Sequence, residues 1–268
     1  MKKIAVIGGD IRLKIVVEKL REKGFSVETL GLFDDESGNI GECDAVVFPV
    51  PTTRDKKTVF APFSKREILL SDIEKMLLPH QLILCCNYRF ESKICIDYGN
   101  LDSFAVLNAI PTAEAAIALA VQNTDFTLWN SRVLITGFGR VGKILADRLS
   151  SLGADITVSA RKQSDFALAS SHGYKVLHTA TLGEKPLDFD VIFNTLDFTA
   201  IDNQSLERTS ASYILDLSSR GGFDLEYAKK LGINAMMAPG LPGKTASFTA
   251  GTILAQTVCE LLDNQVML

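Results

Sequence analysis

RVLITGFGRVG, residues 132–142, is the stretch that decides the fold of this chain. A short aliphatic and β-branched run ends in Gly-x-Gly-x-x-Gly, and apolar residues then recur at helical spacing (Ile144, Leu145, Leu149 and Leu152). A second strand pattern, DITVSAR, follows at residues 155–161. Strand, glycine-rich turn, helix and strand in this order predict a dinucleotide-binding Rossmann domain. The alternative is a tight strand-to-helix turn that holds no ligand.

Each glycine of this turn has its own task. Gly137 permits the tight turn, Gly139 lets the backbone approach a pyrophosphate, and Gly142 lets the helix pack closely on the strand. The helix N-terminus then presents free N–H groups and a positive dipole to the phosphates. We therefore expect the dinucleotide to be bound by Gly137, Phe138, Gly139, Arg140, Val141 and Gly142.

The end of the second strand indicates which dinucleotide binds. NAD sites usually carry an acid here, which holds the ribose 2′-hydroxyl. This chain has Ser159, Ala160, Arg161 and Lys162 instead, and its first acid is Asp165. Arginine and lysine pair with a 2′-phosphate, which a carboxylate would repel. We predict NADP as the cofactor, with NAD as the less favoured choice; otherwise Arg161 and Lys162 are ordinary solvated loop charges.

Composition narrows the class of protein. The 268 residues suit two domains of moderate size or one large one, and 47% are hydrophobic. The net charge of −4 and the lack of a basic tract argue against binding to nucleic acid or to an anionic membrane. The N-terminal apolar run stops at Gly8-Gly9, too early for a signal peptide, and we expect no apolar stretch of membrane-spanning length.

The five cysteines show no metal-ligand spacing. We interpret them as free, mostly buried thiols in a reducing cytoplasm, and we predict a cytoplasmic protein without a metal. The adjacent pair Cys85-Cys86 is interpreted as the end of a strand rather than as a redox-active pair.

Strand and helix patterns alternate along the whole chain, which predicts parallel sheets. A helix from Ser71 is predicted by a capping box with Glu74, and a helix near 110–121, with Thr112 as its cap, is expected to connect two domains. The predicted strands are 3–7, 26–30, 44–50, 81–85, 104–107, 132–136, 155–161, 191–195, 212–217 and 234–238.

We therefore predict an α/β protein with two Rossmann-like domains, parallel sheets and a cleft between them. Residues 1–110 form the N-terminal substrate or catalytic domain, onto which a C-terminal helix, about 248–268, packs back. Residues 111–247 form the NADP-binding Rossmann domain. Ligands of such sheets lie beyond the carboxyl ends of the strands, so Asn194 and Thr195 are expected at the nicotinamide ribose. The alternative for these two residues is a turn-forming role.

The layout resembles that of the D-2-hydroxyacid dehydrogenases. Residues 215–222, LDLSSRGG, resemble the segment that carries the arginine for the substrate carboxylate in that family. The family also needs a late histidine as acid and base. None of His80, His172 and His178 lies at a late strand end, and Ala238–Gly243 takes that place. This difference argues against ordinary 2-hydroxyacid chemistry.

Several segments together resemble the family of the dipicolinate synthase A chain. The likeness covers nearly the whole chain, and the segments keep their order and spacing; Arg220 and residues 244–247 depart from the family pattern. The matching segments are GGDIR (8–12), NAIPTAE (108–114), NTDFT (123–127), GFGRVG (137–142), DLSSRGG (216–222), APGLPG (238–243) and TAG (249–251).

The resemblance implies the oxidation of a dihydrodipicolinate-type ring to pyridine-2,6-dicarboxylate in sporulation, with NADP as hydride acceptor. It also implies an oligomeric assembly with the second, flavoprotein-like component of dipicolinate synthase, its B chain. A small ring dicarboxylate needs cationic partners, for which arginine is best suited. The expected catalytic residues are Asp10, Glu114 and Arg220, with Asp10 or Glu114 as the base. The expected substrate-binding residues are Arg12, Asn108, Thr112, Ser218, Arg220 and Lys244.

Each of these residues also has a purely structural interpretation. Asp10 fits a helix N-cap, and Glu114 fits a first-turn residue that answers the helix dipole. Arg12 fits a solvated helix face, Arg220 an ion pair that closes a loop, and Lys244 an ordinary surface position. Two other functions stay open: an NAD(P)-dependent dehydrogenase of another small carboxylic acid, and a nucleotide-binding component without catalysis.

Overall fold

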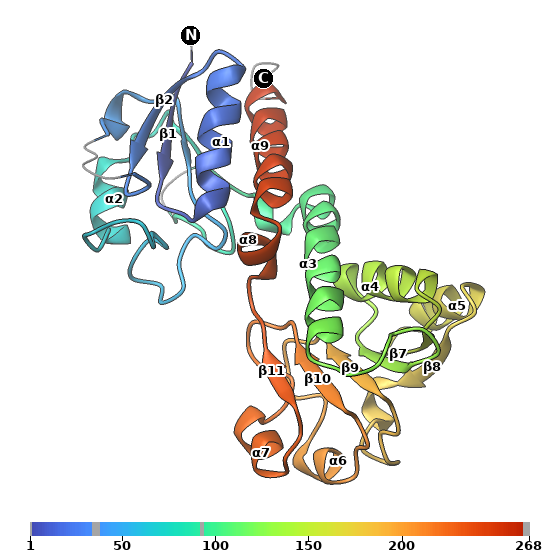
Figure 1. Cartoon of the computed structure of the whole chain (residues 1–268). Helices are drawn as coiled ribbons and strands as arrows, with labels where there is room; N and C mark the ends of the chain where they lie inside the picture. Colours follow the sequence, from blue (N-terminus) through green and yellow to red (C-terminus); the bar gives the residue numbers. More distant parts are fainter. Residues whose placement is uncertain (1, 34–37, 92–93, 265–268) are drawn as a thin grey trace. The chain divides into compact units, whose positions relative to one another are not determined.

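The computed structural model describes residues 2–33, 38–91 and 94–264, and it divides into two compact units (Figure 1). The first unit runs up to Asn108 and resumes at Ala246, whereas the second spans Ala109–Thr245. Each unit contains one sheet whose strands pair in parallel, with helices on both of its faces. The predicted α/β class with two Rossmann-like sheets is confirmed.

The first unit has the strand order β2-β1-β3-β4-β5. This is the order of flavodoxin-like sheets, in which the chain reverses direction across the sheet between β1 and β3. Ligands of open α/β sheets bind beyond the carboxyl ends of the strands at such a switch point. The elements are β1 (Lys3–Ile7), α1 (Ile11–Glu22), β2 (Ser26–Leu30), η1 (Ile40–Glu42), β3 (Ala45–Val47), α2 (Leu70–Met76), β4 (Leu82–Cys85), β5 (Cys95–Asp97), η2 (Tyr98–Asn100) and α9 (Ser247–Asn264).

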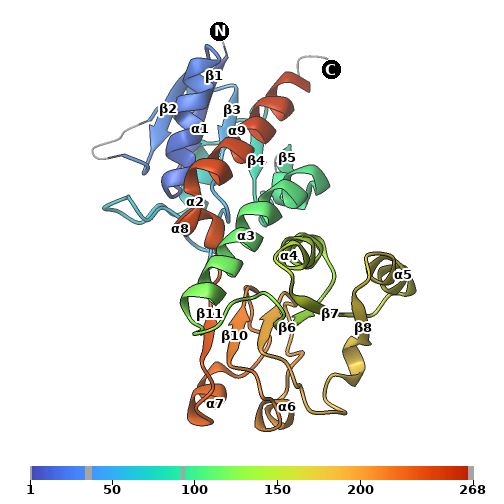
Figure 2. The same cartoon turned by 45° about the vertical axis from the view of Figure 1, so that its right-hand side comes forward.

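Alternating side chains of β1 build two cores on opposite faces of this sheet, as the pleat requires. Ile4 and Val6 pack with α1 and α9, whereas Ala5 and Ile7 pack with α2. Helices α1 and α9 lie side by side in both views (Figures 1 and 2). Their approach is close at Gly251, where a Cβ atom would lie 2.8 Å from Ile15 Cδ1.

The second unit has the strand order β11-β10-β9-β6-β7-β8, the order of dinucleotide-binding Rossmann sheets. Its switch point lies between β6 and β9. Helix α3 (Asp102–Gln122) leads into it from the first unit. The other elements are β6 (Arg132–Thr136), α4 (Arg140–Ser151), β7 (Asp155–Ala160), α5 (Gln163–Ser171), β8 (Lys175–His178), η3 (Thr179–Thr181), β9 (Val191–Asn194), α6 (Asn203–Glu207), β10 (Tyr213–Asp216), α7 (Leu225–Lys230), β11 (Ala235–Met237) and α8 (Leu241–Thr245).

The sheet of the second unit is also covered on both faces. Val133 and Ile135 of β6 pack into a core that includes residues of α3, α4 and α5. Leu134, between them, belongs to a second core with residues of α6 and α7. Figure 2 shows α4 on one side of this sheet and α6 and α7 on the other.

The predicted strand at 104–107 is wrong. These residues lie in the first turns of α3, whose bounds are Asp102–Gln122. A run of four apolar residues does not distinguish a strand from a helix segment. The fifth strand of the sheet is instead Cys95–Asp97, which is only three residues long and was not predicted.

Both predicted helix caps are also wrong. Ser71 lies inside α2, whose N-cap is Leu69. Thr112 lies in the interior of α3, directly after Pro111. Proline is common in the first turn of a helix, which made residue 110 look like a helix start, but here the chain was already helical from Asp102.

Helix α3 corrects one more expectation. With 21 residues and a mean hydropathy of 1.7, it is long and apolar enough to cross a membrane, although no stretch of that kind was expected. Ala113, Ala116 and Ala120 are completely buried against the sheet of the second unit. Length and composition alone are weak support for a membrane span, and these contacts are those of a core helix.

Candidate functional site

The glycine-rich turn lies at the switch point of the second unit, between β6 and α4. Gly137 has φ +94°, and a Cβ atom there would lie 2.6 Å from Thr195 Oγ1. A Cβ atom on Gly142 would overlap the carbonyl oxygen of Gly137. The fold itself therefore requires these two glycines. Gly139 differs, because it is exposed and a Cβ atom there would meet nothing within 4 Å.

The start of α4 is suited to an anion. Its N-cap is Gly139, and within the described residues no side chain caps it and its first turn holds no acid. The first N–H groups of a helix have no partner inside the helix, and the helix dipole favours negative charge at this end. The open space at Gly139 and these N–H groups fit the pyrophosphate of a dinucleotide. Phe138, by contrast, packs into the core, edge-on to Tyr174.

The end of β7 lies beside this turn. Ser159 and Ala160 are buried, and Ser159 Oγ accepts hydrogen bonds from Gly137 N and from Thr179 Oγ1, both at 3.3 Å. Their predicted role as direct cofactor contacts is therefore corrected: Ser159 fastens the glycine turn to β7, and Ala160 belongs to the core.

Arg161 and Lys162 follow the end of β7 and are exposed. The Arg161 guanidinium lies 5.4 Å from the centroid of the Phe198 ring, which belongs to the loop after β9. Asp165, the nearest acid along the chain, forms an ion pair with Lys143 of α4 at 3.4 Å. A positive strand end with its neighbouring acid occupied fits a 2′-phosphate.

A buried polar network joins the strand ends across the switch point. Asn194 Nδ2 donates to Asp216 Oδ1 (2.8 Å), and Asn194 Oδ1 accepts from Thr136 Oγ1 (2.5 Å). Asp216 Oδ2 accepts from Gly222 N at 2.6 Å. Because Asn194 is completely buried, its predicted contact with the cofactor is corrected to a positioning role. Thr195 is half-buried, and its Oγ1 donates to Thr136 O.

Asp216 was missed from the sequence. Its signal was an acid at the end of the otherwise apolar run YILD, six residues before Gly222. A Cβ atom on Gly222 would overlap the amide of Asn194, so the loop 217–222 closes over this network only because glycine stands there. The same loop carries Arg220 at an exposed position. Ser218 is buried and accepts a hydrogen bond from Gly221 N (3.0 Å), so it shapes the loop.

At the switch point of the first unit, Asp10 and Arg12 form a buried ion pair. Asp10 is the N-cap of α1 and accepts from Arg12 N. The guanidinium donates from Nε to Asp10 Oδ1 (2.9 Å) and from Nη2 to Asp10 Oδ2 (2.8 Å). Nη2 also donates to Val50 O, beyond β3, at 2.6 Å. Arg12 is only 5% exposed, so its interpretation as a solvated helix face is wrong.

These bonds leave Arg12 part of its hydrogen-bonding capacity. An arginine has five N–H groups, and three are used by Asp10 and Val50. The two N–H groups of Nη1 take no part in them. The Asp10 carboxylate, with both oxygens on the guanidinium, orients Arg12; its role as a catalytic base stays a prediction.

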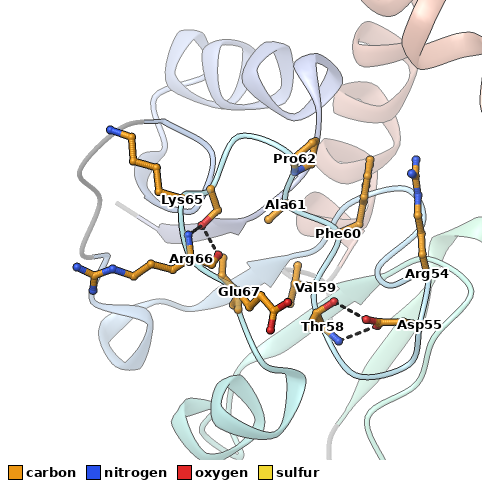
Figure 3. A pocket seen from close by; sticks show the side chains of 12 residues that line it. Arg54, Asp55, Thr58, Val59, Phe60, Ala61, Pro62, Lys65, Arg66 and Glu67 are labelled. Carbon is orange, nitrogen blue, oxygen red and sulfur yellow. Dashed lines mark hydrogen bonds between the residues drawn. The ribbon is translucent and has the colours of Figure 1, made fainter.

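The first unit also contains a cavity of about 360 Å³, lined by residues 54–68 (Figure 3). The loop that forms it is tied to the turn after β1, because Gly9 N donates to Phe60 O at 2.7 Å. Asp55 accepts from the backbone and side chain of Thr58, and these bonds hold the pKa of its carboxyl group well below the usual range. Lys65 and Arg66 extend away from Val59 (Figure 3), so the cations do not converge on the cavity.

The remaining predicted site residues lie on α3 and α8. Glu114 is exposed and forms an ion pair at 3.7 Å with Arg148, in the last turn of α4. It is neither in a first turn nor beside the glycine turn, which argues against a role as the base. Asn108 and Thr112 are half-buried and, being four residues apart, share a face of α3. Lys244 is exposed on α8.

No group of three or more metal-ligating side chains occurs within residues 2–33, 38–91 and 94–264. The absence of a metal from the protein stays a prediction.

Comparisons with known proteins agree with this geometry. The profile of the N-terminal domain of the dipicolinate synthase A chain matches residues 3–105. The dipicolinate synthase A chain of Bacillus subtilis (strain 168) is 34% identical over 283 residues, which cover 97% of this chain and 95% of that protein. The crystal structure of that Bacillus subtilis protein, also 34% identical, has a TM-score of 0.87 and covers 98% of this chain and 96% of that one.

A more distant likeness concerns the fold alone. The apo-structure of D-lactate dehydrogenase from Escherichia coli is 15% identical, with a TM-score of 0.61 over 98% of this chain and 96% of that one. This agrees with the dehydrogenase-like layout expected from the sequence. The Bacillus subtilis relative, by contrast, matches in sequence over nearly its full length, so the resemblance found in the motifs is confirmed: the chain belongs to the family of the dipicolinate synthase A chain.

Proposed function

We propose that this protein is an NADP-dependent oxidoreductase that converts dihydrodipicolinate, or its hydrated precursor, to dipicolinate during sporulation. The observation that carries the proposal is the open, uncapped start of α4 at the switch point, with Arg161 exposed at the neighbouring strand end. Membership in the family of the dipicolinate synthase A chain supports the choice of substrate. The names of the relatives also support a partner, the B chain of dipicolinate synthase, and an oligomeric enzyme of the cytoplasm.

The residues that would hold NADP follow from the site. The N–H groups at the start of α4 and the backbone at Gly139 would bind the pyrophosphate, and Arg161 with Lys162 would bind the 2′-phosphate. Phe198, already in contact with Arg161, would support that side chain. When bound, NADP supplies a hydride acceptor.

The substrate needs partners for two carboxylates. Arg12 is our first candidate, because Asp10 holds it in place while its Nη1 stays available. Arg220, exposed on the loop that the Asn194–Asp216 network supports, is the second, and Lys244 is the third. Oxidation of the dihydro ring removes one hydride and one proton and leaves an aromatic ring, so binding and orientation are the main tasks of these side chains.

The first experiment titrates the purified chain with NADP and NAD, using protein fluorescence or calorimetry. We expect binding of both, with NADP bound more tightly. The second incubates the chain with freshly prepared dihydrodipicolinate precursor and NADP, with and without the B chain, and follows absorbance of pyridine dicarboxylate. Binding of neither dinucleotide would overturn the cofactor assignment. Tight binding of NADP without product in either mixture would overturn the substrate and favour another small carboxylic acid or a non-catalytic role.

A further inference from the structure

Two cysteines on neighbouring strands of the first unit bring their sulfur atoms together. Cys85 is the last residue of β4, and Cys95 is the first residue of β5, the edge strand of the sheet. Ile83 of β4 is the register partner of Cys95, and alternation places Cys85 on the same face as Ile83. Both cysteines are free thiols, and their Sγ atoms lie 2.8 Å apart. A disulfide needs about 2.05 Å, so a small movement closes the bond.

The two thiols have different surroundings. Cys85 is completely buried in the core beside α2, whereas Cys95 is half-buried on the sheet edge. The hydrogen bond from the Cys85 thiol lowers the pKa of Cys95 to about 7, although burial and the charge of Asp97 act in the opposite direction. A backbone hydrogen bond from Phe90 and the charge of Arg89 act with it. The same contact with Cys95 raises the pKa of Cys85. One thiol is therefore set up to attack and the other to follow.

We propose that Cys85 and Cys95 form a reversible dithiol–disulfide pair that is oxidised by hydroperoxides. The Cys95 thiolate attacks one peroxide oxygen; an S–O bond forms, the O–O bond breaks, and the departing oxygen takes a proton to give water or an alcohol. The Cys85 sulfur then attacks Cys95; the S–S bond forms, the S–O bond breaks, and hydroxide leaves with the Cys85 proton as water. Two thiols supply the two electrons that reduce the peroxide. A dithiol reductant restores both thiols.

The other cysteines lack this arrangement. Cys86 follows Cys85 in the chain, but it packs into the opposite core with α1 and α9, where burial raises its pKa to about 12. Cys43 and Cys259 are also buried, and burial raises the pKa of each. A thiolate is the reactive form of cysteine, so oxidation should begin at Cys95 and end at Cys85. The proposal does not depend on the reaction that the protein catalyses.

The test treats the full chain with hydrogen peroxide, quenches it with catalase, and counts free thiols after unfolding in an alkylating reagent. We expect the wild-type chain to lose two of its five thiols. Peptide mapping should join Cys85 to Cys95, and dithiothreitol should restore both. Cys95→Ser should abolish the cross-link, and Cys259→Ser is the matched control that should keep it. Cys85→Ser tests the buried partner, and Cys95→Ser serves alone if that variant does not fold.

Three results would overturn the proposal. The first is a wild-type chain that keeps all five thiols under peroxide that fully oxidises a model dithiol. The second is a cross-link that includes Cys86 or survives in Cys95→Ser. The third is conversion of Cys95 to its sulfinic acid with no cross-link, because that result shows that Cys85 does not reach it.

Discussion

The Arg12 guanidinium binds Asp10 through two hydrogen bonds, Nε to Oδ1 at 2.9 Å and Nη2 to Oδ2 at 2.8 Å. The pair stands where β1 and β3 part, and Nη2 reaches across to Val50 O. One carboxylate thus caps α1 and orients an arginine at the point of the sheet where ligands bind in this kind of fold. The ion pair links the stability of the first unit to the readiness of its candidate carboxylate site.

Replacing Asp10 should destabilise the protein. Asp10→Ala leaves the Arg12 charge uncompensated at a side-chain exposure of 6% and also removes the cap of α1. Breaking a buried pair costs about 3–5 kcal/mol. We expect about 3 kcal/mol, because Asp10 itself keeps an exposure of 20%. Urea unfolding measures this loss, and Asp10→Ala with Arg12→Leu should recover part of it. Asp72→Ala, which breaks an exposed pair with Lys75, is the control; an equal effect of both variants would contradict the assignment.

Two glycines of the same turn should respond differently to alanine. Gly142→Ala places a methyl group on the carbonyl oxygen of Gly137 and should lower the melting temperature markedly. Gly139→Ala finds open space and should melt within a few degrees of the wild type. If the pyrophosphate lies against Gly139, the added methyl group should still weaken dinucleotide binding by at least about tenfold. Unchanged affinity in Gly139→Ala would move the cofactor away from this turn.

Arg161 should decide between the two dinucleotides. Removing a charge-assisted hydrogen bond costs about 1.5–3 kcal/mol, so Arg161→Ala should weaken NADP binding by about 10- to 100-fold and change NAD binding little. Titration of both dinucleotides measures the ratio of affinities. Arg148→Ala, which removes an arginine in the last turn of α4, is the matched control and should leave the ratio unchanged. A constant ratio in Arg161→Ala would rule out a contact with the 2′-phosphate.

Acid should weaken the clamp between β6 and β9. Hydrogen bonds from Arg132 hold the pKa of Asp190 below its usual value. A carboxyl group with a lowered folded pKa stabilises the protein above its unfolded pKa of about 3.9, and this stability is lost as the pH falls through the folded value. Asp190→Asn should therefore be less stable than the wild type at pH 7. The difference should shrink below about pH 4, as measured by urea unfolding across pH.

The partner of Asp190 provides the control for this experiment. In an Arg132→Gln background, Asp190→Asn should change the pH dependence much less, because the cation that lowers the pKa of Asp190 is gone. A gap between wild type and Asp190→Asn that stays constant down to pH 2 would show that the carboxylate charge plays no part.

Local patterns allowed much of the fold to be predicted. Gly137, Gly139 and Gly142 mark a turn that needs no distant residue to be recognised, and the aliphatic strands around them are equally local. Cys95–Asp97 escaped because three residues carry too little pattern for a strand; only their pairing with β4 defines them. The start of α3 was mistaken for a strand for the opposite reason, since FAVL fits either structure.

The candidate site was predicted only where single residues show themselves. Arg161 and Lys162 follow a strand pattern directly, so they could be identified without a structure. The burial of Asn194 depends on Asp216 and Gly222, which come from another strand and its loop, and such a network has no local signature. The N-cap role of Asp10 was among the alternatives, but the bond from Arg12 to Val50 joins residues 38 positions apart and was beyond prediction.

Helix α9 has a consequence for how the chain is made. It closes the core that α1 and β1 begin, with Leu254 and Val258 completely or almost completely buried there, yet every residue of the second unit precedes it. On the ribosome, the nucleotide-binding half therefore leaves the exit tunnel complete while the half that started first still waits for its last helix. A chain released early would carry a finished second unit and an apolar groove along α1, the surface that chaperones and proteases recognise.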